Sequence, residues 1–322
     1  MAERLGDYSL ECVVGRGGMA EVHRAVGVAG PNQGRVVAIK RLLPELARDP
    51  VFIDAFASEA DVSRALRHPG IVGVLDIGMQ GDTTFIVMDF IEGHDLSQVI
   101  KAAGEKKMPL PVTLCCYVAH VIALALDYAH RARSKSGEPL GLVHCDVSPS
   151  NIFVANDGQV RLGDFGVAHS RLVTTALTEQ GIAGKAAYLS PEQIEEERLS
   201  PATDVFALGA VLFEMLCGRR AFIGKSTQEV LKRICSGDVP RVRSIRDSVP
   251  EKVDAVVARA LAVDRPSKEP SFTDRMRRVL PGQHLVRYAT AAHFAIELEV
   301  AYDHESASDA ALGSLVRGLF SS

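Results

Sequence analysis

The stretch over residues 144–166, HCDVSPSNIFVANDGQVRLGDFG, constrains the fold more than any other part of the chain. Two short apolar runs, IFV and VRL, flank an Asn-Asp-Gly turn, and this pattern predicts a β-hairpin. A hairpin brings its two ends together. Asp146 and Asn151 at one end and Asp164 at the other are therefore predicted to converge on one small volume.

Two carboxylates and an amide gathered in a largely apolar setting need a compensating charge. The carboxylates would repel each other and shift their pKa values unless a cation lay between them. The hairpin therefore predicts a magnesium–phosphate site. The alternative, which this stretch alone leaves open, is a polar hairpin whose acidic side chains lie in water.

The composition excludes several classes of protein. A chain of 322 residues is long for one domain, so two lobes or domains are expected. The formal net charge of -4 gives no basic footprint for nucleic acid and no polybasic membrane signal. The six cysteines form no Cys-x-x-Cys pair, the N-terminus lacks a signal-peptide core, and no apolar run reaches the ~18–20 residues of a membrane span. These features predict a cytoplasmic, reducing environment, with no nucleic-acid partner and no membrane segment.

A glycine-rich loop, GRGGMAEV, lies between two strand-like runs near the N-terminus. Gly15, Gly17 and Gly18 would let backbone amides approach a phosphate without Cβ clashes. Taken alone, this signal favours the alternative of a simple tight hairpin.

A lysine and a glutamate follow at the ends of two predicted elements. Lys40 ends a strand over 35–40, and the helix predicted over 49–66 has an apolar stripe that contains Glu59. The apolar members of that stripe are Phe52, Ala55, Val62 and Leu66. A carboxylate on a packing face is costly unless it meets a cation, and Lys40 is the nearest one upstream. This region alone slightly favours the alternative, a Glu59 at the edge of the stripe that reaches water.

Strands are predicted over 71–77 and 83–88, and beyond residue 93 the composition becomes helical. A lobe boundary is expected there, with a crevice in which a purine bonds to backbone at Asp89 and Ile91. Helices are predicted over 112–133, 204–217, 253–262, 288–300 and 309–320. Asp204, in the first turn of its helix, is expected to accept hydrogen bonds from the backbone of a neighbouring loop.

In chain order, the sequence gives GRGGMAEV, VAIK, a helical Glu59, HCDVSPSN, DFG, SPE and DVFALG. This series resembles the eukaryotic-type protein kinases, and specifically the bacterial serine/threonine kinases. The resemblance covers about Tyr8 to Val300. It implies an α+β fold of two lobes, in which a small antiparallel β-sheet lobe with one helix joins a larger, mainly helical lobe. The implied ranges are 8–91 and 92–301, with an inserted loop at about 265–286 and a C-terminal tail helix within 302–322.

The resemblance also assigns roles to residues. Lys40 would bind the α- and β-phosphates of ATP and pair with Glu59. Asp146 would accept or orient the proton of the substrate hydroxyl, and Asn151 and Asp164 would hold Mg²⁺, with Mn²⁺ as the alternative ion. The implied nucleotide contacts are Gly15, Arg16, Gly17, Gly18, Val22, Ala38, Lys40, Met88, Asp89, Ile91 and Phe153.

Every group needed for phosphoryl transfer is thus present, which favours an active enzyme acting on a serine or threonine of a protein substrate, with autophosphorylation. A second implied pair, Glu192 with Arg287, would be structural. The alternative function is a pseudokinase that binds nucleotide, or nothing, and acts as a scaffold.

The sequence departs from the family pattern at three positions. Cys145 replaces the arginine that usually binds a phosphothreonine, so we expect weak dependence on phosphorylation at Thr174, Thr175 and Thr178. Ser148 stands where a lysine near the γ-phosphate is usual, and Lys185 stands where a threonine is usual. One hypothesis joins the last two departures: Lys185 extends its ammonium toward Asp146 and the γ-phosphate and is catalytic. The alternative is a solvent-facing Lys185 that touches nothing.

The last predicted helix has an apolar stripe along one side. Its members are Leu312, Leu315, Val316, Leu319 and Phe320. Packing of this stripe on its own lobe is the favoured interpretation, and docking of a protein partner is the alternative.

Overall fold

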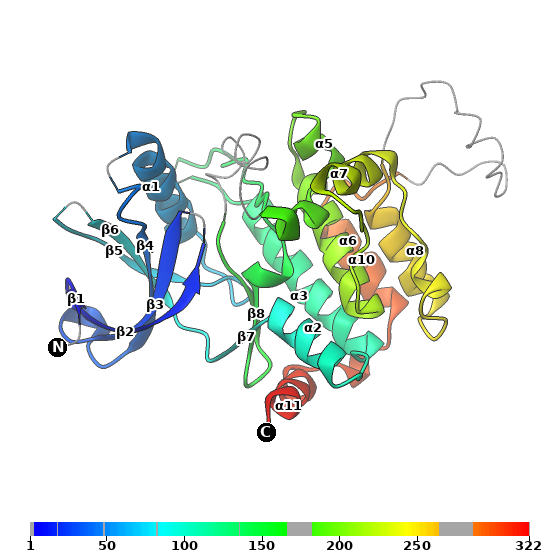
Figure 1. Cartoon of the computed structure of the whole chain (residues 1–322), viewed down its shortest axis with the longest axis horizontal. Helices are drawn as coiled ribbons and strands as arrows, with labels where there is room; N and C mark the ends of the chain where they lie inside the picture. Colours follow the sequence, from blue (N-terminus) through cyan, green and yellow to red (C-terminus); the bar gives the residue numbers. More distant parts are fainter. Residues whose placement is uncertain are drawn as a thin grey trace.

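The computed structural model describes residues 3–17, 19–47, 49–81, 83–134, 136–165, 182–263 and 286–321. Figure 1 shows a β-rich lobe made from the first part of the chain and a larger helical lobe made from the rest. The lobe boundary predicted at residues 91 and 92 falls in the segment between the last strand of the first sheet and the short strand β7.

The β-rich lobe is one six-stranded antiparallel sheet with strand order β1-β2-β3-β4-β6-β5. Its strands are β1 (Arg4–Leu5), β2 (Tyr8–Arg16), β3 (Ala20–Gly27), β4 (Val36–Leu42), β5 (Val74–Gln80) and β6 (Thr83–Asp89). A 3₁₀ turn, η1 (Gly30–Asn32), lies between β3 and β4. Side chains alternate along β3, where buried Ala25 packs with Val37 and Val87 in one cluster, as expected for a sheet with a covered face. The two faces of the sheet therefore carry separate apolar clusters, one of which receives the helix α1.

The helix α1 (Pro50–Ala65) confirms the helix predicted over 49–66 to within one residue at each end. Asp49 caps it by accepting a hydrogen bond from Val51 N–H, and a proline occupies its first turn, where a missing N–H costs nothing. The buried face has Phe56 and Ala60 near its centre. The predicted stripe lies on the same face, because Leu66 is buried and Phe52 and Val62 are partly buried against the core clusters. Glu59 lies in the middle of this face.

The strand predicted over 71–77 is wrong at its start, because β5 begins at Val74. Ile71 forms an isolated parallel bridge with Leu162, and Val72 N–H donates to Leu162 O at 2.9 Å. These residues pair with a hairpin of the other lobe instead of extending β5. Backbone pairing thus ties the β-rich lobe to the hairpin that carries the predicted site.

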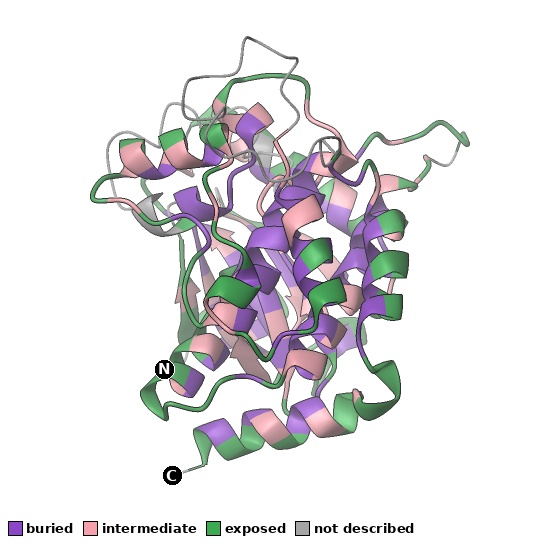
Figure 2. Cartoon of the chain, turned by 90° about the vertical axis from the view of Figure 1, so that its right-hand side faces the viewer, coloured by how far each residue is buried: buried purple, intermediate pink, exposed green. Residues whose placement is uncertain are grey.

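The helical lobe is built around α6 (Pro201–Cys217), most of which is buried. Figure 2 shows buried residues (purple) concentrated on the inward faces of its helices. Ser200 and Thr203 form a capping box at the start of α6, and Gly218 ends it in the left-handed region at φ 66°. The other helices are α2 (Leu96–Glu105), α3 (Val112–His130), α5 (Pro191–Ile194), α7 (Thr227–Ser236), α8 (Glu251–Ala260), α10 (Ala291–Ala301) and α11 (Asp309–Phe320). Short 3₁₀ turns are η2 (Pro149–Asn151), η3 (Ile182–Tyr188), η4 (Val242–Ser244) and η5 (His304–Ser306).

Several helix boundaries differ from the prediction, and α8 spans 251–260 where 253–262 was predicted. The helix α3 ends at His130, three residues early, and α6 begins at Pro201 because its cap lies upstream of Asp204. The helix α10 begins at Ala291 because Thr290 accepts from His293 N–H and so caps it. A local polar cap decided the starts of α6 and α10 more strongly than the apolar pattern did.

The prediction that no apolar run reaches the length of a membrane span needs correction. By length and composition, α3 is long and apolar enough to cross a membrane, with 19 residues. In the structure it packs against α6 and α10 inside the helical lobe, and most of its length is buried. Such apolarity is typical of a central core helix.

The predicted hairpin is confirmed as β8 (Ile152–Ala155) and β9 (Val160–Leu162), which form a three-stranded sheet with β7 (Gly93–Asp95). Its turn ends at Gly158, where φ is 95° and a side chain would be strained. The hairpin ends then lie side by side through the register of Ile152 with Leu162.

The helix α11 packs against the tip of this hairpin. A Cβ on Gly158 would lie 1.7 Å from Asp309 O, and a Cβ on Gly313 would lie 2.7 Å from Asp157 C. Leu312, Val316 and Leu319 are buried in the same contact, and Tyr117 Oη donates to Asp309 Oδ1 at 2.7 Å. The apolar stripe therefore packs on its own lobe, as favoured, and the described structure leaves little of it free for a partner. The inserted loop predicted at about 265–286 lies outside the described residues except for Val286.

We predict that Gly313→Ala lowers the free energy of unfolding by about 1–3 kcal/mol, because the new methyl group overlaps the turn at Asp157. Gly318, on the same helix, has nothing within 4 Å of an added Cβ. The control Gly318→Ala is expected to stabilise by about 0.4–1 kcal/mol, because alanine has a better helix propensity. Urea unfolding followed by circular dichroism measures both changes. Equal effects of the two substitutions would show that α11 does not pack on the turn.

Candidate active site

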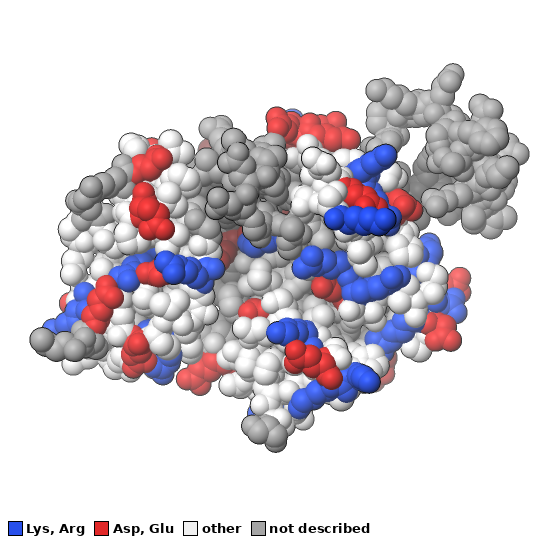
Figure 3. All heavy atoms as spheres, in the orientation of Figure 1, with Lys and Arg blue, Asp and Glu red and all other residues white. Residues whose placement is uncertain are grey.

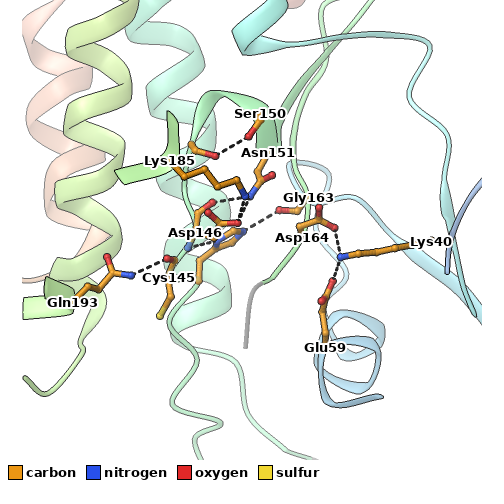
Figure 4. Close-up of polar contacts among 12 residues, drawn as sticks. Lys40, Glu59, Cys145, Asp146, Ser150, Asn151, Gly163, Asp164, Lys185 and Gln193 are labelled. Carbon is orange, nitrogen blue, oxygen red and sulfur yellow. Dashed lines mark hydrogen bonds and ion pairs between the residues drawn. The ribbon is translucent and has the colours of Figure 1, made fainter. Parts of the chain in front are cut away.

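Lys40, from the middle of β4, lies between two carboxylates. Its Nζ is 2.5 Å from Glu59 Oε1 and 3.0 Å from Asp164 Oδ1. Lys40 is 7% exposed and Glu59 4% exposed. The alternative in which Glu59 reaches water is therefore wrong. The helical glutamate anchors the strand lysine (Figure 4), because burying either charge without the other would be costly.

The three charges set one another's protonation. Burial alone would lower the pKa of Lys40, but Asp164 and Glu59 outweigh it and hold that pKa above its usual range. Burial raises the pKa of Asp164, yet Lys40 outweighs this effect and leaves it below its usual range. Burial raises the pKa of Glu59 by more than Lys40 lowers it. The ammonium and the Asp164 carboxylate are thus ionised at neutral pH.

The second half of the site is the loop before β8. Asn151 Nδ2 donates to Asp146 O at 2.8 Å and to Asp146 Oδ2 at 2.9 Å. Lys185, in η3, places its Nζ 2.6 Å from the same Oδ2 atom. The alternative of a Lys185 that touches nothing is wrong, although its side chain is 44% exposed. In Figure 4, Asp146 lies on the side of Lys185 and Asp164 on the side of Lys40.

Asp204, in the first turn of α6, holds the backbone of this loop. Its carboxylate, which is fully buried, accepts from His144 N–H and Cys145 N–H, both at 2.8 Å, and is 2.7 Å from His130 Nε2. The backbone hydrogen bonds confirm the prediction made for Asp204. They also fix Cys145 at φ 64°, a conformation that costs a residue with a side chain about 1–3 kcal/mol. Asp146 follows directly, so Asp204 sets its position.

Sequence reasoning missed several of these supports. His144 links the two ends of the hairpin region, because its Nε2 lies 3.0 Å from Gly163 O while its Nδ1 accepts from Asp146 N–H at 3.2 Å. Gln193 Nε2 donates to Cys145 O at 2.9 Å. The SPEQ pattern signalled Gln193 as part of a capping box, but nothing local signalled its contact with a loop 48 residues away.

The predicted nucleotide-contacting residues come from neighbouring strands. The register pairs Gly15 with Val22, Val22 with Lys40, and Ala38 with Met88. Arg16 ends β2, and Gly17 N–H donates to Ala20 O at 2.8 Å. Gly18 of the loop lies outside the described residues, as do Gly166, Thr174, Thr175 and Thr178. Phe153, on β8, lies against Gly163 just before Asp164.

The segment between the lobes is held by Asp89. Its carboxylate oxygens lie 2.6 Å from Arg35 Nη2, on the β4 side, and 3.2 Å from Arg161 Nη1, on β9. Its side chain thus serves both lobes, which leaves only the backbone at Asp89 and Ile91 for the predicted purine contacts.

Asn151 and Asp164 fit a magnesium ion by their chemistry. Asn151 uses Nδ2 for its hydrogen bonds and Asp164 uses Oδ1 for Lys40, so each keeps an oxygen that accepts no hydrogen bond from the described residues. Within the same residues, no group of three His, Cys, Asp or Glu side chains forms a dedicated metal cage. Mg²⁺ prefers this arrangement, because it binds few protein oxygens together with substrate phosphates.

Two further predictions concern polar groups near the site. Arg287 Nη1 lies 2.7 Å from Glu192 Oε1, and Arg287 Nε donates to Ala262 O at 2.9 Å. The predicted pair therefore exists, and it joins α5 to the segment before α10. Ser148 is buried and its Oγ is 3.1 Å from Ser150 Oγ.

A strand lysine anchored by a helical glutamate, facing a loop that presents an aspartate and an asparagine from a helical lobe, defines the protein kinase class. The chain belongs to this family: the model of the protein kinase domain matches residues 8–281. The fold agrees with the kinase domain of PknI from Mycobacterium tuberculosis, with a TM-score of 0.64 at 24% identity, over 94% of this chain and 98% of that one.

The curated relatives include bacterial kinases of both hydroxyl specificities. The chain is 35% identical to the tyrosine-protein kinase MasK of Myxococcus xanthus, over 87% of this chain and 44% of that protein. It is 34% identical to the serine/threonine-protein kinase PrkC of Bacillus subtilis, over 80% and 38% respectively. It is 33% identical to the probable serine/threonine-protein kinase PknB of Bifidobacterium longum, over 91% and 39%. The chain thus spans less than half the length of these relatives.

We predict that Asp204→Ala lowers the free energy of unfolding by about 3–5 kcal/mol, because it leaves two buried N–H groups and His130 without their acceptor. Glu105→Ala, on α2, is the control, since Glu105 and its ion-pair partner Lys101 are both exposed. This control is expected to cost about 1 kcal/mol or less. Urea unfolding measures both, and equal losses would contradict the central role of Asp204.

Proposed function

We propose that this domain is an ATP-dependent protein serine/threonine kinase that transfers the γ-phosphoryl group to a protein hydroxyl and phosphorylates itself. The observation that carries the proposal is the chain of contacts from Glu59 through Lys40 to Asp164, opposite Asp146 and Asn151. These are the groups that phosphoryl transfer needs, since catalysis there is mostly positioning and charge stabilisation. The serine/threonine assignment is supported by the GxxxYLSPE segment and by most of the relatives' names.

Each residue has a physical task in this proposal. Glu59 fixes the ammonium of Lys40, so that it meets phosphate oxygens of ATP without first ordering a flexible side chain. Asp146 accepts or orients the proton of the attacking hydroxyl, and its amide partner Asn151 holds the carboxylate in place. Asn151 and Asp164 hold the magnesium ion, which neutralises charge on the phosphates when bound.

Lys185 is proposed as a further catalytic residue. Its ammonium lies beside Asp146. The buried Ser148, at the position where the family usually has a lysine, supplies no charge. A cation there stabilises the charge of the transferred phosphoryl group.

The proposal extends to the cellular compartment and the partners of this domain. All six cysteines are free thiols, which supports a reducing, cytoplasmic compartment for this domain. A protein substrate and ATP are the proposed partners, with no nucleic acid. The pseudokinase alternative would keep nucleotide binding without transfer.

We predict that incubation with ATP and Mg²⁺ adds phosphate to the protein or to a protein substrate, as read by mass spectrometry. Asp146→Asn should lower the transfer rate at least about a hundredfold, because the proton acceptor is lost, while nucleotide affinity stays close to that of the wild type. Absence of phosphate from the wild-type protein, with ATP binding retained, would establish the pseudokinase alternative instead.

We predict that Lys185→Ala lowers kcat by about tenfold or more and changes the KM for ATP much less, since the lost charge acts on the transferring group. Lys101→Ala is the control, because Lys101 is exposed on α2 and its closest acidic partner is Glu105 at 3.8 Å. Steady-state kinetics with varied ATP measures both constants. An unchanged kcat in the Lys185 variant would refute its catalytic role.

A further inference from the structure

One part of the helical lobe has a charge opposite to that of the whole chain. Residues 217–247, from the end of α6 to the segment before α8, carry eight Lys and Arg against three Asp and Glu. The whole chain carries 36 against 40. In Figure 3, basic side chains gather over the part of the visible face formed by the helical lobe. If charged residues were scattered evenly, this segment would have the same ratio of basic to acidic residues as the whole chain. The excess of basic residues is therefore a local feature of this surface.

The basic segment encloses a pocket of ≈ 400 Å³. Its walls come from two helix ends, where α6 stops at Gly218 and α7 stops at Gly237, both in the left-handed conformation. The side chains that matter at the pocket are Arg219, Arg220, Arg233, Asp238 and Ile223. Ile223 is 49% exposed, so the pocket offers an apolar contact beside its charges.

The helix C-termini at the pocket do not neutralise the positive charge of the basic segment. A helix C-terminus carries about half a negative charge, so the two ends offset about one of the net positive charges that eight Lys and Arg against three Asp and Glu leave on residues 217–247. Arg233 pairs with Glu229 at 3.0 Å, but both side chains are more than one-third exposed, so the pair is weak. Among the described residues, no acidic side chain forms an ion pair with Arg219. A positive charge therefore remains for a ligand.

The pocket lies next to the segment that carries Lys185. The helix α7 packs against η3, and α6 packs against the same turn. Tyr188, the last residue of η3, is hydrogen-bonded through its hydroxyl to Glu214 of α6. A 3₁₀ helix rises about 2 Å per residue, so Lys185 and Tyr188 are roughly 6 Å apart along the turn. A polypeptide with its hydroxyl at Asp146 can thus reach the pocket within a few residues.

We propose that this pocket docks an acidic segment of the protein substrate, with a Glu or Asp carboxylate on Arg219 and Arg233 and a neighbouring apolar side chain on Ile223. Guanidinium groups suit this task, because they bind carboxylates through two parallel hydrogen bonds. The inference rests on the proposed kinase function for the identity of its ligand. It adds the substrate chemistry that the catalytic residues leave unspecified.

Binding of a fluorescent peptide to the Asp146→Asn protein, measured by anisotropy, tests the proposal without consuming the peptide. The probe is a short peptide with one serine, one leucine and a run of glutamates, compared with the same peptide carrying glutamines. The glutamate peptide is expected to bind at least about fivefold more tightly, and the difference should shrink as salt rises. Equal affinities for the two peptides would overturn the proposal.

The double substitution Arg219→Gln and Arg233→Gln should remove most of the preference for glutamate. Its control is Lys101→Gln with Lys252→Gln, which removes the same charge from exposed positions on α2 and α8. The control is expected to keep the preference, and a loss equal to that of the arginine variant would show a general charge effect instead of a pocket. Thermal unfolding of both variants verifies that each remains folded.

Autophosphorylation of the wild-type and arginine-variant chains, each with Asp146 intact, separates this proposal from the proposed function. If the wild type transfers phosphate and the peptide preference is absent, docking fails while the kinase function stands. If the preference is present and no transfer occurs, the pocket stands and the kinase function fails.

Discussion

The ammonium of Lys40 is the charge on which the rest of the site depends. It comes from a strand of one lobe and bonds to Glu59 of a helix and to Asp164 of the opposite lobe. Lys40 and Glu59 are buried, so neither charge is stable there without the other, and the partly exposed Asp164 adds a second carboxylate to the ammonium. The bond to Asp164 also fixes the hairpin end relative to the sheet. One ion-pair chain thus connects the lobes and leaves the second Asp164 oxygen without a hydrogen bond from the described residues.

The opposite half of the site depends on Asp204 in the same way. Its buried carboxylate holds the backbone of His144 and Cys145 from a helix start 60 residues away. His144 then connects that loop to Gly163, next to Asp164. The two halves of the site are therefore linked by His144 and by the hydrogen bond from Gly163 N–H to Asn151 O at 2.8 Å, and Asp89 links the two lobes through Arg35 and Arg161. Both lobes are positioned by polar contacts between groups far apart in the chain.

Much of this arrangement was predictable from local pattern. The hairpin followed from an Asn-Asp-Gly turn between apolar runs, and the convergence of its ends followed from hairpin geometry. The central helix α6 followed from its apolarity on all sides. The burial of Glu59 was harder to predict, because the helical period of the apolar residues could not distinguish a glutamate inside the stripe from one at its edge. The predicted stripe does lie on the packing face, but only packing against the sheet showed that Phe56 and Ala60 form its centre.

The sequence by itself determined the elements and the order of the catalytic groups, because turns, caps and apolar periods are local properties of the chain. Only the tertiary structure decided which charges pair. The contacts of Lys185 with Asp146, Gln193 with Cys145 and Tyr188 with Glu214 join separate elements, and the packing of α11 on the hairpin tip needs two facing glycines. Such contacts depend on the distance between side chains after folding, which no local pattern encodes.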